Sequence, residues 1–63
     1  MNIGDRVKIV HTPYVAKSLQ VGKTGRVVRL MFGLVDVVMD DGYPDGDGAV
    51  DWPFDPEELE VVV

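Results

Sequence analysis

The fold is decided by one stretch of this sequence, GKTGRVVRLMFGLVDVVMDDG, which spans residues 22–42. It holds two runs rich in valine and other strand-forming residues, Arg26–Phe32 and Leu34–Met39, and glycines flank and separate them. A single glycine between two such runs indicates a tight turn, so we predict a β-hairpin that turns at Gly33. In the second run Asp36 alternates with valines, which places those valines on the face that meets the core.

The rest of the chain supplies the other predicted elements. Apolar and basic residues alternate over Arg6–His11, which predicts a first strand that a following proline ends. The turn residues DDGYPDGDG at 40–48 predict an exposed acidic loop. We predict further strands at Ala49–Trp52 and Glu60–Val63. Between them, Asp55–Glu58 combines an N-cap residue, a proline and two acids, which is typical of a short 3-10 turn.

Alternation along these strands selects the residues expected in the interior. The predicted core consists of Val7, Ile9, Val27, Val35, Val37, Met39, Val50, Leu59 and Val61. Four further apolar residues fall out of step with this set: Val10, Val28, Leu30 and Val38. Either a β-bulge shifts the register of the second strand, or an apolar patch faces outward and marks an interface.

The patterns GDRVKI at residues 4–9, GKTGRVV at 22–28 and VDV at 35–37 together resemble the KOW motif. KOW domains are Src-homology-3-like (SH3-like) small barrels of ribosomal proteins and transcription elongation factors. The ending from Pro53 to Val61 is similar to the last turn and strand of many bacterial and phage SH3-like barrel proteins. The resemblance implies an all-β fold, a five-stranded SH3-like barrel with one 3-10 turn before the last strand, formed by residues 1–63 as a single domain.

The chain is short, at 63 residues, and contains no cysteine. A domain of this size buries only about 60% of the surface that its unfolded chain exposes. No apolar run approaches the roughly 20 residues that a membrane span needs. No apolar leader follows Met1, so we expect a cytoplasmic protein that does not contact membranes.

The charges of this small acidic protein are distributed unevenly. The net charge is −5, all six Lys and Arg residues lie before residue 30, and ten of the eleven acids lie from Asp36 onward. This asymmetry indicates either two functional faces or strands from the two halves that lie side by side and neutralise one another.

The sequence offers little for catalysis or metal binding. His11 is the only histidine and Ser18 the only serine, and a chain this short has little room for a walled pocket. Asp45 and Asp47 carry hard oxygen ligands, but Phe54 stands where an EF-hand loop needs its last carboxylate. We therefore predict no enzymatic activity, no metal site and no cofactor.

Nucleic-acid binding is the second candidate function, and the KOW resemblance implies it. The basic residues of the first two predicted strands and the turn between them would contact phosphates: Arg6, Lys8, Lys23, Arg26 and Arg29. Tyr14 or Phe32 would stack on a base. The ten acids in the same small body oppose this interpretation.

Protein binding is the interpretation that we favour. The chain carries aromatic and acidic residues of the kind that recognition modules expose: Tyr14, Tyr43, Asp45, Asp47, Trp52 and Phe54. For Trp52 and Phe54 we expect core filling ahead of binding, because the chain has few large residues to fill its interior. The partner would be another protein or a second copy of this chain. A role as accessory subunit of an enzyme complex is a further alternative, because some SH3-like barrels support a catalytic partner chain.

Overall fold

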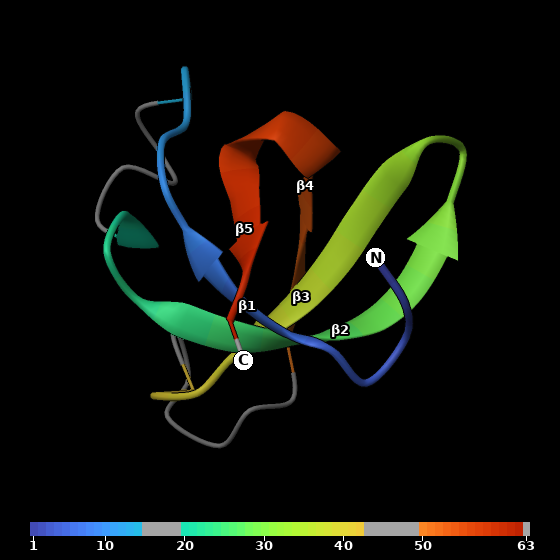
Figure 1. Cartoon of the computed structure of the whole chain (residues 1–63), viewed down its shortest axis with the longest axis horizontal. Helices are drawn as coiled ribbons and strands as arrows, with labels where there is room; N and C mark the ends of the chain where they lie inside the picture. The colour runs from blue at the N-terminus through green and yellow to red at the C-terminus, as the bar shows by residue number, and fades with distance from the viewer. Residues whose placement is uncertain (15–19, 43–49, 63) are drawn as a thin grey trace.

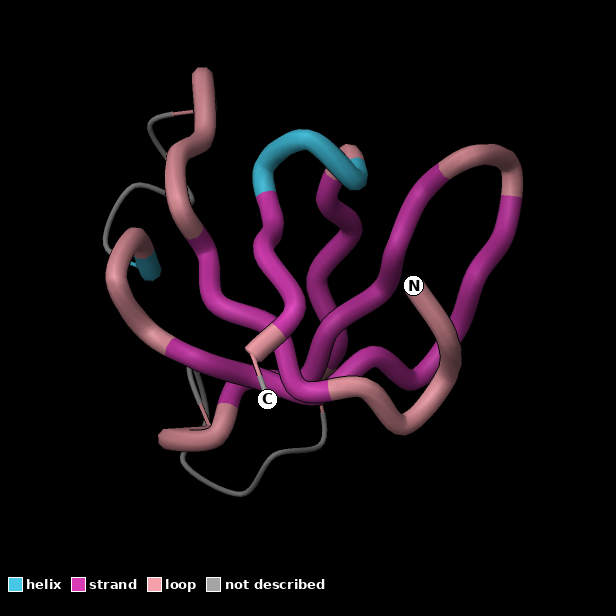
Figure 2. Tube along the Cα trace, in the orientation of Figure 1, coloured by secondary structure: helices cyan, strands magenta, loops and turns pink. Residues whose placement is uncertain are grey.

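The computed structural model describes residues 1–14, 20–42 and 50–62. Its strands and 3-10 turn are β1 Arg6–Ile9, β2 Thr24–Met31, β3 Leu34–Met39, β4 Asp51–Phe54, η2 Pro56–Glu58 and β5 Leu59–Val61. All five strands belong to one antiparallel sheet in the order β4-β3-β2-β1-β5 (Figures 1 and 2). The predicted all-β fold with a 3-10 turn before the last strand is therefore confirmed.

The predicted hairpin is the longest paired unit of the sheet. Strands β2 and β3 pair from Gly25 opposite Met39 to Met31 opposite Leu34. The two residues of the turn, Phe32 and Gly33, both have positive φ, 54° and 75°. Positive φ at both positions is what a type I′ turn requires, and this turn matches the twist of the strands it joins.

A β-bulge interrupts β2 at Val28. The register shifts by one residue between Val27 and Arg29, which leaves Val28 without an opposite residue. The first explanation for the out-of-step apolar residues is therefore confirmed. Three of them, Val10, Val28 and Leu30, are also exposed. Leu30 is 44% exposed because the hairpin extends beyond the body of the sheet (Figure 1).

Gly25 allows β2 to approach β3 closely. A Cβ atom at this position would lie 2.6 Å from Val37 Cγ1 and 2.6 Å from the backbone oxygen of Val38. The second of these atoms belongs to the backbone, so it cannot move aside cheaply. The absence of a side chain at Gly25 thus sets the distance between the two strands.

Strand β4 differs from the prediction. It covers Asp51–Phe54, whereas the sequence predicted a strand over Ala49–Trp52, of which Ala49 lies outside the described residues. The strand includes Pro53, although proline cannot donate a ladder hydrogen bond. Proline is tolerated here because β4 is an outer strand of the sheet.

The core draws on all five strands. It contains Val7, Ile9, Val27, Val35, Val37, Met39, Phe54 and Leu59. Phe54 takes the place predicted for Val50, which is only half-buried, because β4 begins after Val50. The prediction that Val61 is buried was wrong: it lies opposite Val7 but is 44% exposed, because it ends an outer strand.

The sheet is strongly curved. The Cα trace of the whole chain has nearly equal principal extents of 24, 24 and 23 Å, and Figure 1 shows β2 bending along its length. The turn η2 links the outer strands β4 and β5 along the chain. These two strands do not pair with each other in the part of the chain that the structure describes, so the sheet is open there.

Candidate functional site

Exposed apolar side chains gather at the tip of the β2–β3 hairpin. We call this group the hairpin surface; it consists of Met1, Leu30, Met31, Phe32 and Leu34, which line one shallow pocket. Phe32 is 92% exposed, and the other four side chains are 37% to 48% exposed. Contiguous exposed apolar surface of this kind is typical of interaction sites in small domains.

Phe32 also occupies an unfavourable backbone conformation. Its φ of 54° lies in the left-handed region, which favours Gly, Asn and Asp. A residue with a bulky side chain pays about 1–2 kcal/mol there. An aromatic side chain that is exposed and held in a strained turn is typical of a binding residue.

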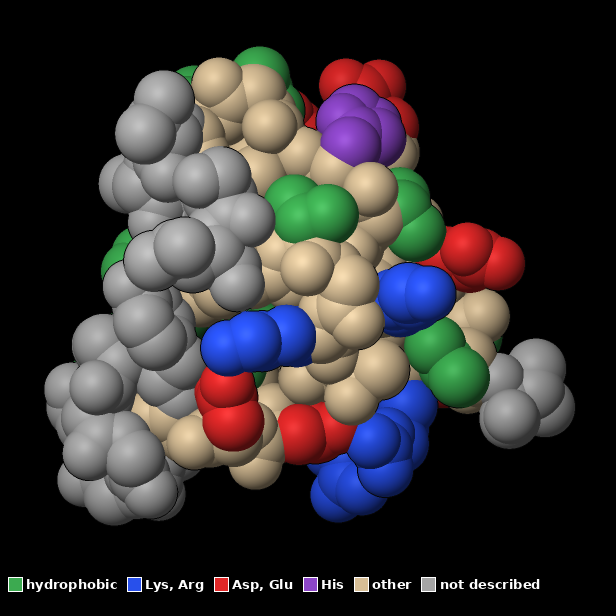
Figure 3. Space-filling view, turned by 90° about the vertical axis from the view of Figure 1, so that its left-hand side faces the viewer, with side chains coloured by type: hydrophobic (Ala, Val, Ile, Leu, Met, Phe, Trp, Pro, Cys, Tyr) green, Lys and Arg blue, Asp and Glu red, His purple; other side chains and the backbone are tan. Residues whose placement is uncertain are grey.

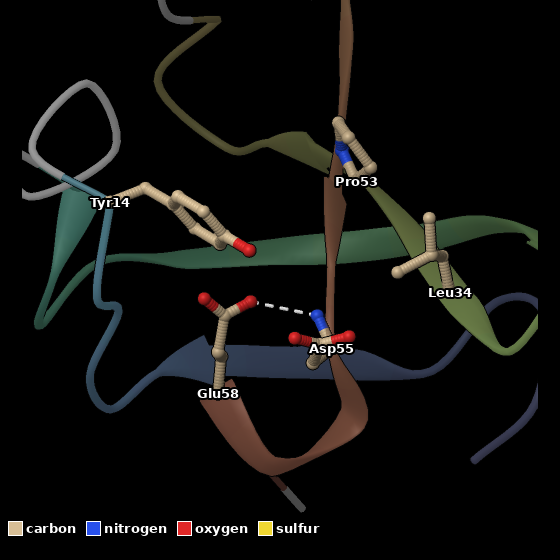
Figure 4. Close-up of a pocket in the computed structure, with 5 residues that line it drawn as sticks. All are labelled: Tyr14, Leu34, Pro53, Asp55 and Glu58. Carbon is tan, nitrogen blue, oxygen red and sulfur yellow. Dashed lines mark hydrogen bonds between the residues drawn. The ribbon is translucent and has the colours of Figure 1, made fainter.

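A second concave site adjoins the hairpin surface. We call it the Tyr14 pocket; it has a volume of about 230 Å³ and is lined by Tyr14, Leu34, Pro53, Asp55 and Glu58. Figure 4 shows the ring of Tyr14 extending across the pocket, with Leu34 of β3 and Pro53 of β4 on the opposite side. Because Leu34 belongs to both sites, the hairpin surface and the Tyr14 pocket are continuous.

The Tyr14 pocket contains a buried carboxylate. Glu58, the last residue of η2, is only 1% exposed. Its Oε1 accepts a hydrogen bond from Thr12 Oγ1 at 2.8 Å. Its Oε2 accepts one from the backbone nitrogen of Asp55 at 2.7 Å, the bond drawn as a dashed line in Figure 4. Its backbone oxygen accepts a hydrogen bond from the nitrogen of Val10 at 2.9 Å. These bonds connect Glu58, at the end of η2, to Asp55 just before η2 and to the segment that follows β1.

The structure separates the six residues that the sequence nominated for protein binding. Tyr14 lies in the pocket that carries its name. Trp52 is half-buried and packs against the core, and Phe54 is fully buried within it. Phe54 therefore fills the core and is not available as an exposed binding residue. Three nominated residues lie outside the described part of the chain: Tyr43, Asp45 and Asp47.

The basic residues nominated for nucleic-acid binding lie beside acids. Arg6 of β1 forms an ion pair with Asp40, which also accepts a hydrogen bond from Thr24 Oγ1 at 2.6 Å. Lys23 forms an ion pair with Asp41 at 2.9 Å. Figure 3 shows basic and acidic side chains in contact on one face of the molecule.

The remaining three basic residues differ from one another. Arg29 of β2 lies 3.5 Å from Asp36 of β3 and 3.7 Å from Asp51 of β4. Lys8 and Arg26 form no ion pair with any residue that the structure describes. Charge neutralisation between strands, one of the two interpretations of the uneven charge distribution, therefore accounts for three of the five residues.

The described residues hold no assembled metal centre. Within residues 1–14, 20–42 and 50–62 there is no group of three or more His, Cys, Asp or Glu that could hold a metal ion. His11 is exposed. Over the same residues, no helix has the length and apolar character needed to span a membrane.

Two buried polar residues, Glu58 and Gln20, were not among the site residues predicted from the sequence. Glu58 could have been found, because an acidic N-cap followed three residues later by Glu is the signature of a capping box. Gln20 could not, because it lies in a stretch without a period. Gln20 is fully buried, and neither Oε1 nor Nε2 of its side chain has a hydrogen-bond partner among the described residues.

Comparison with known proteins assigns no family. No protein-family model matches the chain, and neither the curated proteins nor the solved structures contain a significant match. The functional interpretation therefore depends on the geometry and charge of the two sites.

Proposed function

We propose that this chain is a protein-recognition module that binds a segment of a partner protein at the hairpin surface. The observation that carries this proposal is Phe32, a 92% exposed aromatic residue in a strained turn that forms part of an apolar surface. Aromatic and methionine side chains are enriched where proteins meet, and a few of them supply most of the binding energy.

The charge of the chain favours a basic partner. A second copy would bring a further net charge of −5 toward the first, and like charges oppose association. A partner segment that combines apolar and basic residues would contact the hairpin surface without this repulsion. An accessory subunit of an enzyme complex would use the same surface, with the catalytic chain as its partner.

We also propose that the curved sheet belongs to the SH3-like small barrels. The position of η2 immediately before the last strand and the KOW resemblance support this proposal. An experimental structure of the whole chain tests it: contact between the outer strands β4 and β5 that completes the barrel is expected, and a gap there would contradict it.

Replacing Phe32 by Asn tests the proposed binding site. Asparagine accepts positive φ better than phenylalanine, so Phe32→Asn should raise the free energy of unfolding by about 1 kcal/mol. The same change removes the central aromatic side chain, so it should weaken binding by about 30-fold or more. The probe is a peptide selected from a displayed random library, and calorimetric titration measures its affinity.

The matched control is Val21→Asn, which removes an apolar side chain that is 44% exposed and does not belong to the hairpin surface. It should change the affinity less than about twofold, because residues outside a hot spot contribute little. Chemical-shift changes caused by the peptide should centre on residues 30–34. Equal losses in the two variants, or shifts centred on Lys8 and Arg26, would refute the proposed site.

A further inference from the structure

We propose that the Tyr14 pocket binds a lysine or arginine side chain of the partner protein. This inference rests on the proposed function, because it specifies the part of the partner that enters beside the hairpin surface. The pocket and the hairpin surface share Leu34, so one partner segment can occupy both.

The buried carboxylate of Glu58 is the first reason. Buried charges in proteins are normally compensated by an opposite charge as well as by hydrogen bonds. Both donors to Glu58, the Thr12 hydroxyl and the Asp55 backbone nitrogen, are uncharged. None of the described ion pairs includes Glu58, and its side chain lines the Tyr14 pocket.

The walls of the pocket are the second reason. Tyr14, Leu34 and Pro53 present mainly apolar surface, while Asp55 and Glu58 contribute carboxylates (Figure 4). A lysine or arginine side chain has the complementary structure, with an apolar stem and a cationic end. The stem would pack on the three apolar walls, and the face of the Tyr14 ring would add a cation–π attraction.

The charge around the pocket is the third reason. Residues 51–62 include five acids and no basic residue. Glu60 lies opposite Lys8 in the sheet, whereas Asp55 and Glu57 form no ion pair with any residue of the described ranges. Their summed field attracts cations toward this end of the molecule and accelerates encounter with a basic segment.

The probes for the test are N-acetyl-arginine methylamide and N-acetyl-lysine methylamide. Each is titrated at constant ionic strength into the ¹⁵N-labelled whole chain, with N-acetyl-norleucine methylamide as the uncharged analogue. We expect the two cationic probes to shift the amide signals of Tyr14, Asp55 and Glu58 saturably. The norleucine derivative should bind at least about 10-fold more weakly, because it lacks the charge-assisted interaction.

Glu58→Gln removes the charge and preserves the local hydrogen bonds. The amide oxygen of glutamine can accept from the Asp55 nitrogen, and its NH₂ group can donate to Thr12 Oγ1. We expect this variant to bind the arginine probe about 10- to 100-fold more weakly. Glu57→Gln is the matched control: it removes the same charge from an exposed neighbour outside the pocket and should change the affinity less than about twofold.

Three results would overturn the inference: no saturable shifts with either cationic probe, equal binding of the norleucine derivative, or equal losses in Glu57→Gln and Glu58→Gln. If Glu58→Gln does not fold, Asp55→Asn serves in its place, because Asp55 donates to Glu58 through its backbone and keeps that bond. The affinity of the Asp55→Asn variant for the arginine probe should fall at least about fivefold, and an unchanged affinity would refute the inference. Phe32→Asn should leave binding of the cationic probes unchanged. The peptide titration therefore tests the hairpin surface, and the probe titration tests the Tyr14 pocket independently.

Discussion

Gln20 has a side chain whose chemistry conflicts with its surroundings. It is completely buried, yet both polar atoms of its side chain lack a hydrogen-bond partner among the described residues. Its backbone oxygen, in contrast, accepts a hydrogen bond from the nitrogen of Lys23 at 3.0 Å. A buried amide that finds no partner costs about 1–3 kcal/mol, so we expect an apolar side chain to be more favourable at this position.

Gln20→Met should therefore stabilise the protein. Methionine has a similar length and flexibility but needs no hydrogen bond, and the backbone contact to Lys23 is unaffected. We expect the free energy of unfolding to rise by about 1 kcal/mol, measured by urea denaturation. A loss of stability of that size would show that the amide is hydrogen-bonded in the folded protein.

The pairing of β2 with β3 depends on one glycine. Gly25 lies where a Cβ atom would come within 2.6 Å of both Val37 Cγ1 and the oxygen of Val38. The hairpin carries Phe32 at its tip, so the packing of Gly25 at the other end of β2 helps to position the hairpin surface.

Gly25→Ala should destabilise the chain by about 1–3 kcal/mol, because the added methyl group forces the two strands apart. A domain of this length has a total stability of about 3–9 kcal/mol, so the loss should be obvious in thermal unfolding. Val28→Ala in the exposed bulge of the same strand is the control and should change stability by about 0.5 kcal/mol or less. Similar effects of the two changes would contradict the close approach at Gly25.

Most elements could be predicted because the alternation of apolar and polar residues and the positions of glycine and proline are local properties of the sequence. The runs around Asp36 and before Gly33 define both hairpin strands without knowledge of their neighbours. Pro53 misled the prediction of β4, because whether a strand tolerates proline depends on its position in the sheet. The exposure of Val61 has the same origin: its orientation is correct, but burial depends on what lies beside an outer strand.

At the scale of the whole molecule, the sheet order brings the two oppositely charged halves of the sequence together. Arg29 of β2 reaches acids on both β3 and β4, and Arg6 of β1 reaches Asp40 at the end of β3. Charge neutralisation between strands was one of two interpretations of the sequence. The sequence could not show which basic residue lies beside which acid, because pairing between strands is a non-local property. The sequence nominated Tyr14 for protein binding, Phe32 for stacking on a base and Leu30 for an outward apolar patch. It could not assign these residues to the two sites, for the same reason.

This neutralisation predicts weak binding to nucleic acid. Lys8 and Arg26 are the two nominated residues without an ion pair in the described structure, and two phosphate contacts provide little affinity. We expect dissociation constants above about 100 μM for generic DNA and RNA at physiological salt, measured by fluorescence polarisation. Micromolar, salt-sensitive binding that disappears in a Lys8→Ala, Arg26→Ala double variant would instead favour the KOW-like function.

The proline in β4 has a consequence for how the molecules behave at high concentration. An open sheet offers its outer strands as templates on which other chains can add, and this is a common route to fibrils. Pro53 removes one backbone donor from β4, and the charge of Asp55, which forms no ion pair with any described residue, repels an approaching copy. The residue that made the strand hard to recognise thus protects a small, valine-rich protein against aggregation through that strand.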